Sequence, residues 1–282
     1  MKNYQSGVQS QNTGLLTVRN LSKKITMFGL MAGIAAASVL TSCKKEGNEP
    51  GSPSLKLNTE QALAPVAGGA ALNLSDATGT VELGTDGVYT VKNYFEDQGI
   101  YSGTANHRPN GNYYFDFSVN DNKKGASATT EPSSKIWDLS FSGTGNADLR
   151  VNAFPTQASQ IKYINQPFAT VIGTYTTAGS AATAWAAGTT PPSVPFGHNR
   201  TVAAATPTDY LAAAPGHVIK GWYNYYFGTH TLFGTTDLTI LVKDFAGSVY
   251  AVHIFSTYEN ATPVGTPPTN YSWLKLEYKK LP

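Results

Sequence analysis

Hydrophobic and polar positions alternate with a period of two along most of the chain after residue 79. In YYFDFSV, Phe115, Phe117 and Val119 fall on one face, with polar or amphipathic residues between them. In KIWDLSF, Trp137 and Phe141 share a face, and in YSWLKLEYKKL leucine and tyrosine alternate with charged residues. This period is typical of β-strands that bury one face.

The longest alternating stretch, DLTILVKDFAGSVYAVHIFSTY, contains a turn signal in its middle. Asp and Gly at positions 244 and 247 separate two alternating runs, and these residue types favour turns. The stretch therefore predicts a β-hairpin. No segment of ten or more residues after the N-terminal region has a helical stripe. The sequence predicts an all-β, mainly antiparallel domain over residues 79–282.

Residues 166–216 break the alternation. They are rich in Ala, Thr, Pro and Gly and contain two charged residues, Arg200 and Asp209. Long irregular segments inside a compact domain are uncommon and are often functional. We expect an irregular loop that carries His198 near its middle.

The first 42 residues have the features of a lipoprotein signal peptide. Lys23 and Lys24 precede an uncharged apolar run, residues 27–39, which suits a signal-peptide core and is too short to span a membrane. The run ends in LTSC, which resembles a bacterial lipobox and contains the chain's single cysteine. We expect Cys43 to be lipidated, so that the protein is attached to a membrane by a lipid anchor only.

Residues 43–78 are rich in Pro, Gly and Ser and show no sustained period. This composition is typical of a flexible tether. The predicted organisation is a signal peptide over residues 1–42, a tether over 43–78 and a β-domain over 79–282.

Composition and charge exclude several classes of function. Charged residues make up 13% of the chain, about half of the usual fraction. From Cys43 onward there are 16 basic and 18 acidic residues, a formal charge of −2, so nothing indicates nucleic-acid binding. The sequence also lacks the zinc-protease, hydrolase-elbow, Walker-loop and C-x-x-C motifs.

Three segments, KIWDLSF, GWYNYYFGTH and TILVKDFAGSVYAVHIFSTYEN, together with the final YSWLKLEYKKL, resemble the HmuY-like haem-binding lipoproteins of the Bacteroidetes outer membrane. The resemblance covers roughly residues 88–282. It implies an HmuY-like β-domain and a haemophore, lipid-anchored at the outer membrane and exposed on the cell surface. Such a protein captures haem and passes it to a TonB-dependent outer-membrane transporter. The chain departs from the family at Ser142, where a basic residue is common, and in the irregular segment.

The resemblance also implies histidine ligands for the haem iron. Axial ligands are His, Met, Cys or Tyr, and all three methionines precede Cys43. The mature chain therefore offers His, with Tyr as a weaker second choice. Ligation by two histidines would fill both axial positions, which implies a carrier and not an enzyme.

His230 corresponds to the family's downstream ligand position, and His198, in PFGHNR, lies upstream at about the spacing of the other ligand. These two are the predicted metal ligands. Tyr223 is a predicted haem-contacting residue, and Arg200 a candidate partner for a propionate. Trp222 and Tyr223 alternate, so we expect one of them to pack inside and the other to meet solvent or ligand.

The other three histidines, His107, His217 and His253, are expected in turn, surface or sheet positions. An alternative function remains open on the same scaffold. Tyr and Trp rings stack on sugars as well as on porphyrins, so the protein could instead bind glycans or proteins at the cell surface, without haem.

Overall fold

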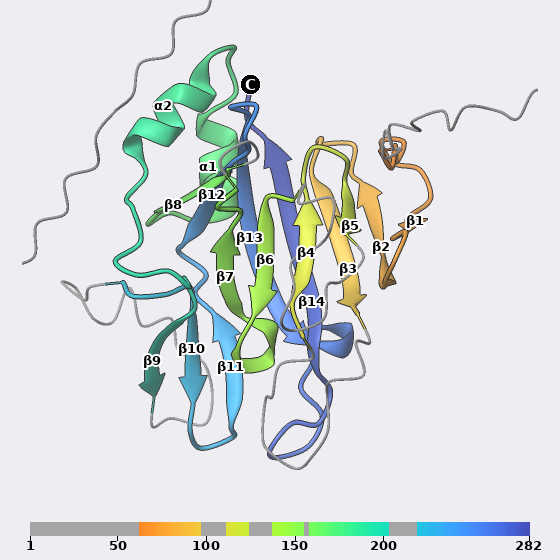
Figure 1. The fold of residues 1–282 in the computed structure, drawn as a ribbon, viewed down its shortest axis with the longest axis vertical. Coiled ribbons are helices and arrows are strands. Elements are labelled where there is room, and N and C mark those ends of the chain that lie inside the picture. Colours follow the sequence, from red (N-terminus) through yellow and green to blue (C-terminus); the bar gives the residue numbers. More distant parts are fainter. Residues whose placement is uncertain (1–61, 97–110, 124–136, 155–157, 203–218) are drawn as a thin grey trace, which may run out of the picture. The chain divides into compact units, whose positions relative to one another are not determined.

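The computed structural model describes residues 62–96, 111–123, 137–154, 158–202 and 219–282 (Figure 1). The predicted signal peptide and Cys43 lie outside the described residues, as do His107 and His217.

A seven-stranded antiparallel sheet is the largest element, with the strand order β1-β2-β3-β14-β13-β12-β8. Its strands are β1 (Leu72–Asn73), β2 (Thr78–Leu83), β3 (Tyr89–Phe95), β8 (Gln160–Ile164), β12 (Thr239–Lys243), β13 (Val249–Tyr258) and β14 (Tyr271–Lys280). The predicted hairpin is confirmed as β12–β13, closed where the amides of Gly247 and Asp244 donate to Asp244 O and Ser248 O.

Two smaller sheets accompany it. One has the order β5-β4-β6-β7 and the other the order β11-β10-β9. Their strands are β4 (Tyr113–Asp116), β5 (Asp121–Lys123), β6 (Leu139–Ser142), β7 (Asp148–Val151), β9 (His198–Val202), β10 (Tyr223–Tyr226) and β11 (Thr231–Gly234). All named pairs are antiparallel except β9 and β10, which are parallel. The predicted all-β, mainly antiparallel class is confirmed.

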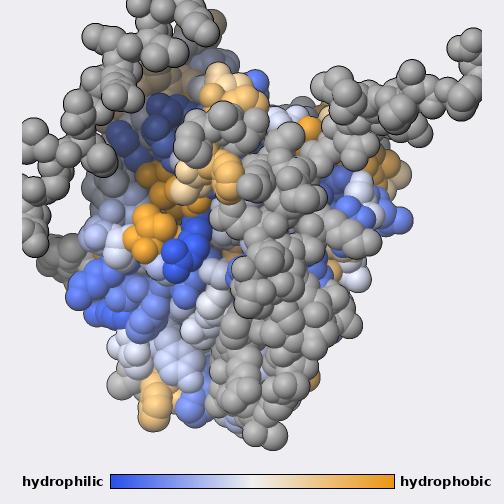
Figure 2. Space-filling model, viewed as in Figure 1, coloured by the Kyte–Doolittle hydropathy of each residue, from blue (hydrophilic) through white to orange (hydrophobic). Residues whose placement is uncertain are grey.

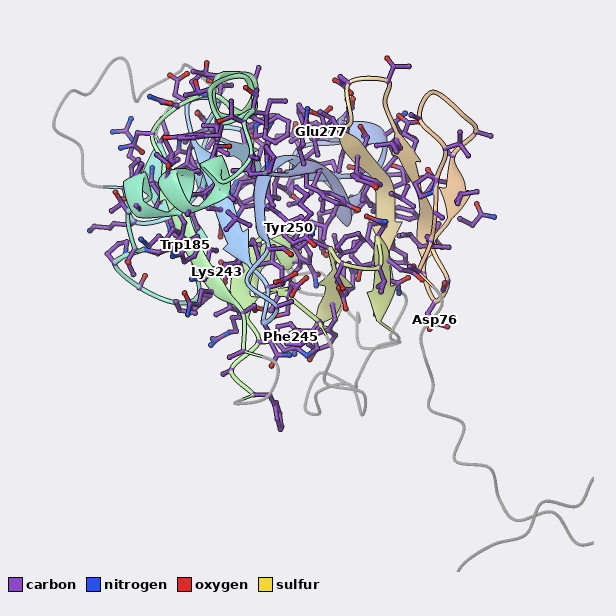
Figure 3. All side chains as sticks on the ribbon, turned by 90° about the horizontal axis from the view of Figure 1, so that it is seen from above. Asp76, Trp185, Lys243, Phe245, Tyr250 and Glu277 are labelled. Carbon is purple, nitrogen blue, oxygen red and sulfur yellow. The ribbon has the colours of Figure 1, made fainter. Side chains whose placement is uncertain are left out.

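The core lies between the inner face of the seven-stranded sheet and the four-stranded sheet, and it is largely aromatic. Phe115 and Phe117 of the predicted inward face reach Tyr278, with ring centroids 5.7 and 4.8 Å apart. Phe117 also stacks on Tyr250 at 5.3 Å, and Figure 3 shows Tyr250 in the middle of the domain. The alternation of Phe115, Phe117 and Phe141 therefore predicted the buried face correctly.

Two short helices and a strand occupy the segment predicted to be irregular. They are α1 (Phe168–Thr174), α2 (Ser180–Ala187) and β9. Alanine, with the highest helix propensity, makes up five of the eight α2 residues. Phe168 and Ala184 pack with Leu241 and Ala251 on the outer face of the large sheet. Each helix was too short to show a stripe over ten residues.

The folded domain begins earlier than the predicted boundary at residue 79. β1 pairs with β2, and Leu74 is buried. The amide of Leu63 donates to Val119 O at 2.9 Å. Backbone pairing thus includes part of a segment whose Pro- and Gly-rich composition indicated a tether.

Two 3-10 turns, Thr144–Asn146 and Glu259–Ala261, complete the described elements. Within these residues, no helix has both the length and the apolar character that a membrane span requires.

Two buried carboxylates, those of Asp116 and Asp138, lie close together at the four-stranded sheet. Asp138, next to Trp137, accepts a hydrogen bond from the amide of Phe117 at 2.9 Å. Asp116 accepts from the amide and hydroxyl of Ser118. Burial, followed by repulsion from Asp116, raises the pKa of Asp138 to about 8. Burial likewise raises the pKa of Asp116. This pair therefore holds a proton in the folded protein at neutral pH.

We predict that removing the aromatic ring of Phe141 will strongly destabilise the fold. Phe141 is fully buried and contacts Tyr94 edge-on at 6.1 Å. Phe141→Ala should lower the free energy of unfolding by about 3–5 kcal/mol, measured by urea unfolding. Phe245→Ala is the control, because Phe245 is 54% exposed and should cost less than about 0.5 kcal/mol. Equal losses in the two variants would contradict the assignment of the core.

We predict that the protein becomes less stable as pH rises from about 4 to 8. Over this range Asp138 is protonated in the folded state and ionised in the unfolded state, so folding takes up a proton. Each pH unit therefore lowers the free energy of unfolding by at most about 1.4 kcal/mol per proton. Urea unfolding at several pH values should show a smaller pH slope for Asp138→Asn than for wild type. The exposed Asp76→Asn variant should keep the wild-type slope, and an unchanged slope in Asp138→Asn would contradict the prediction.

Candidate functional site

The segment GWYNYYFGTH forms strand β10 and the turn that leads into β11. Its odd-numbered aromatic residues become more exposed toward the turn. Tyr223 is 1% exposed, Tyr225 is half-buried and Phe227 is 60% exposed. The hairpin is therefore rooted in the core and presents its aromatic tip to solvent.

Three contacts fix the root of the hairpin. The indole Nε1 of Trp222 donates to Ala147 O at 2.7 Å. The amide of Leu232 donates to the hydroxyl of Tyr258 at 2.7 Å. Gly221 lets the chains approach closely, since a Cβ there would lie 1.8 Å from Gly197 O. These contacts tie the three-stranded sheet to both of the larger sheets.

Trp222 and Tyr223 are both buried, at 3% and 1% exposure. The prediction that one of them would meet solvent or ligand is wrong, because core residues pack against both faces of the sheet at this point. The Tyr223 hydroxyl donates to Asp148 Oδ1 at 3.4 Å. Burial, and then the nearby Asp148 carboxylate, raise the pKa of Tyr223. Tyr223 is therefore a core residue and not part of a ligand-facing wall.

His230 lies in the turn at the tip of the hairpin and has a left-handed backbone, with φ of 55°. Its Nδ1 is hydrogen-bonded to the hydroxyl of Tyr225 at 2.5 Å. Its ring centroid is 5.2 Å from that of Phe227 and 6.0 Å from that of Tyr225. Within the described residues, no hydrogen bond involves Nε2. When Nδ1 carries the proton and donates to Tyr225, the Nε2 lone pair can bind a metal.

His198 lies at the other end of the same small sheet. It is the exposed first residue of β9 and pairs with Tyr223 at the start of β10, whereas His230 follows the end of β10. Four residues along a strand separate the two levels by roughly 13 Å. Figure 1 shows the start of β9 and the β10–β11 turn at opposite ends of the sheet. The structure therefore does not bring the two predicted ligands to one point.

The remaining predicted residues are spread along the sheet. Arg200 is half-buried on β9, opposite Asn224 of β10. His198 contacts its own strand through Thr201, whose hydroxyl lies 3.5 Å from Nε2. His253, expected to be a sheet residue, lies on β13 between Phe168 and Phe255. Burial lowers the pKa of His253 to about 4, so its imidazole is neutral.

The surface around the hairpin is mainly polar. Figure 2 shows a hydrophilic area over β9–β11 at the lower left of the view, with a small hydrophobic group at its lower edge. Phe227 is the most exposed aromatic residue among the described parts of the chain. In those parts, no group of three or more His, Cys, Asp or Glu residues is placed to hold a metal ion. Within the described residues, His230 therefore belongs to no such group.

The sequence pattern pointed to His230 but not to Tyr225 and Phe227, which are the neighbours of its ring in the structure. It pointed instead to Tyr223, which faces the same side of the strand as these two residues. The signal that distinguishes them is distance from the turn. Residues near a hairpin tip lie beyond the packed part of the sheet, so aromatic side chains there are more exposed.

We predict that Gly221→Ala will disrupt the root of the hairpin. The added Cβ would collide with the backbone of residues 197 and 198, so β9 or β10 must move and the unfolding temperature should fall by several degrees. Gly173→Ala in α1 is the matched control. A Cβ at Gly173 meets nothing within 4 Å, and Gly→Ala in a helix should stabilise by about 0.5–1 kcal/mol. Differential scanning calorimetry measures the unfolding temperature of both variants. An unchanged unfolding temperature in Gly221→Ala would contradict the close approach of residue 221 to the backbone of residues 197 and 198.

A comparison of the whole chain with known protein families, with curated proteins and with solved structures finds no match.

Proposed function

We propose that the protein is a haem-binding lipoprotein of the outer membrane, anchored at the cell surface through Cys43. It captures haem with His230 as an axial ligand and delivers it to a TonB-dependent transporter, and it acts as a carrier and not as an enzyme. The proposal rests on the resemblance of its strand motifs to HmuY-like proteins and on the surroundings of His230.

The observation that carries the proposal is the contact between His230 and Tyr225. A histidine that binds a metal through one ring nitrogen usually holds a hydrogen bond through the other, which orients the ring. In the tautomer that leaves the Nε2 lone pair for a metal, Nδ1 donates that bond to the Tyr225 hydroxyl oxygen. The adjacent Phe227 ring offers an exposed apolar surface for a flat porphyrin.

His198 has a different place in this proposal from the one that the sequence suggested. Two axial ligands of one iron lie directly across the porphyrin plane from each other. His198 and His230 are at opposite ends of a short strand pair, so within one chain we assign the iron to His230 alone of these two. Arg200, on the strand that begins at His198, is likewise remote from the tip.

We predict that His230 variants will bind hemin more weakly and with a changed spectrum. In titrations followed at the Soret band, Tyr225→Phe should raise the dissociation constant about 10–100-fold, the usual effect of losing the partner of a metal-binding histidine. His230→Ala should raise it at least as much and shift the band. His198→Ala is the matched control and should leave both unchanged, because it removes a histidine from the same sheet at the other end.

Two results would contradict the proposal. Equal effects of His198→Ala and His230→Ala would mean that both histidines serve the haem. Absence of any Soret change in wild type would remove haem as the ligand. Binding of glycans in an array by the same hemin-negative protein would then favour the alternative surface function.

A further inference from the structure

A cavity of about 460 Å³ opens on the outer face of the seven-stranded sheet, beside α1. Its volume lies in the range of small-molecule sites, roughly 300–1,000 Å³. Glu82, Thr90 and Glu277 line it from three neighbouring strands, β2, β3 and β14, where they are paired in register. Figure 3 shows Glu277 on the side of the sheet away from Tyr250, which lies toward the core.

Apolar residues complete the lining. Phe168 and Ile172 come from α1, and Leu83 and Val88 from the region of β2 and β3. Gly68, Gly69 and Gly84 also line the cavity and, because they have no side chain, leave room for a ligand. The cavity therefore combines an apolar wall with a polar row, as small-molecule sites usually do.

Every charged side chain that lines the cavity is acidic: Glu82, Asp86 and Glu277. Lys92 forms an ion pair with Glu82 at 2.5 Å. The amide of Val88 donates to Asp86 Oδ1, and Lys279 donates to the backbone oxygen of Asp86 and not to its carboxylate. Among the described residues, Glu82 and Asp86 thus each have a partner for one carboxylate oxygen only.

The carboxylate of Glu277 has neither a hydrogen bond nor an ion pair with any described residue of the domain. Burial raises the pKa of its carboxyl group; Lys275 and Lys92 oppose this shift, and Asp86 adds to it. His253, directly opposite Glu277 on β13, supplies no positive charge, because burial lowers its pKa to about 4. A cation entering the cavity would therefore meet a half-buried carboxylate that has no direct counter-ion among the described residues.

We propose that this cavity binds a small organic cation, an amine or guanidinium with a short apolar body. The charged group would lie on Glu277, with the apolar part against Phe168 and Ile172. A neutral sugar could donate hydroxyl groups to these carboxylates but would bring no positive charge to balance them. The site is separate from the β10–β11 hairpin and does not depend on haem binding.

Agmatine, which has a guanidinium and an amine joined by four methylenes, is a suitable probe. Titration calorimetry would use the full-length chain in a non-ionic detergent at low and at physiological ionic strength. Wild type should bind agmatine at both, and Glu277→Gln should raise the dissociation constant about ten-fold or more, through loss of a charge-assisted hydrogen bond. Thermal unfolding of the same samples checks that Glu277→Gln is folded.

Asp76→Asn is the matched control, because it removes the same charge from an exposed position outside the cavity. It should change the dissociation constant less than about two-fold once salt screens distant charges, and His230→Ala should leave it unchanged. Equal weakening by Glu277→Gln and Asp76→Asn would show non-specific attraction and overturn the proposal. Absence of agmatine binding to wild type, or binding of glucose in its place, would also overturn it.

Discussion

Aromatic packing between the two larger sheets is the interaction on which the rest of the structure depends. Phe115 and Phe117 meet rings of β13 and β14, and Phe141 of β6 meets Tyr94 of β3. A chain with one cysteine has no intrachain disulfide to assist them. Many of these rings are tyrosines, whose hydroxyls need partners when buried. Tyr94 donates to Glu96 at 2.6 Å and Tyr278 to Asn120 at 2.9 Å. The core thus gains aromatic area without leaving these hydroxyl groups unpaired.

The three-stranded sheet extends from this core and depends on it. Trp222 and Leu232 belong to the same hydrophobic cluster as the rings between the larger sheets. Because the root of the hairpin is held by these contacts, its tip can present His230, Tyr225 and Phe227 in a defined arrangement. A ligand site on a hairpin tip gains precision when the supporting strands are packed in this way. At the packed end of this sheet, the His198 side chain is exposed and lies near Asp148.

The two regions that we associate with binding lie on different elements and have different chemistry. The hairpin tip offers an imidazole nitrogen and an exposed aromatic ring, which suits a flat metal complex. The cavity beside α1 offers carboxylates and an apolar wall, which suits a cation. The seven-stranded sheet separates the cavity from the aromatic core, so variants in one region should have little effect on the other. The buried Asp116–Asp138 pair belongs to neither region and makes the stability of the fold sensitive to pH.

The sequence by itself determined the strands, and the tertiary structure decided which side chains are available for function. The alternation in KIWDLSF and YSWLKLEYKKL, and the turn residues at 244–247, specify strands and a hairpin through local geometry, and the structure contains them. Local pattern did not show that both faces of β10 are covered at its root, so that Tyr223 is buried while Tyr225 remains half-exposed. Nor did it show that β9 joins β10 in parallel, which sets His198 level with the start of β10 and far from His230. Those outcomes depend on contacts between residues distant in the chain, and alternation along one strand carries no information about which sheet will cover it.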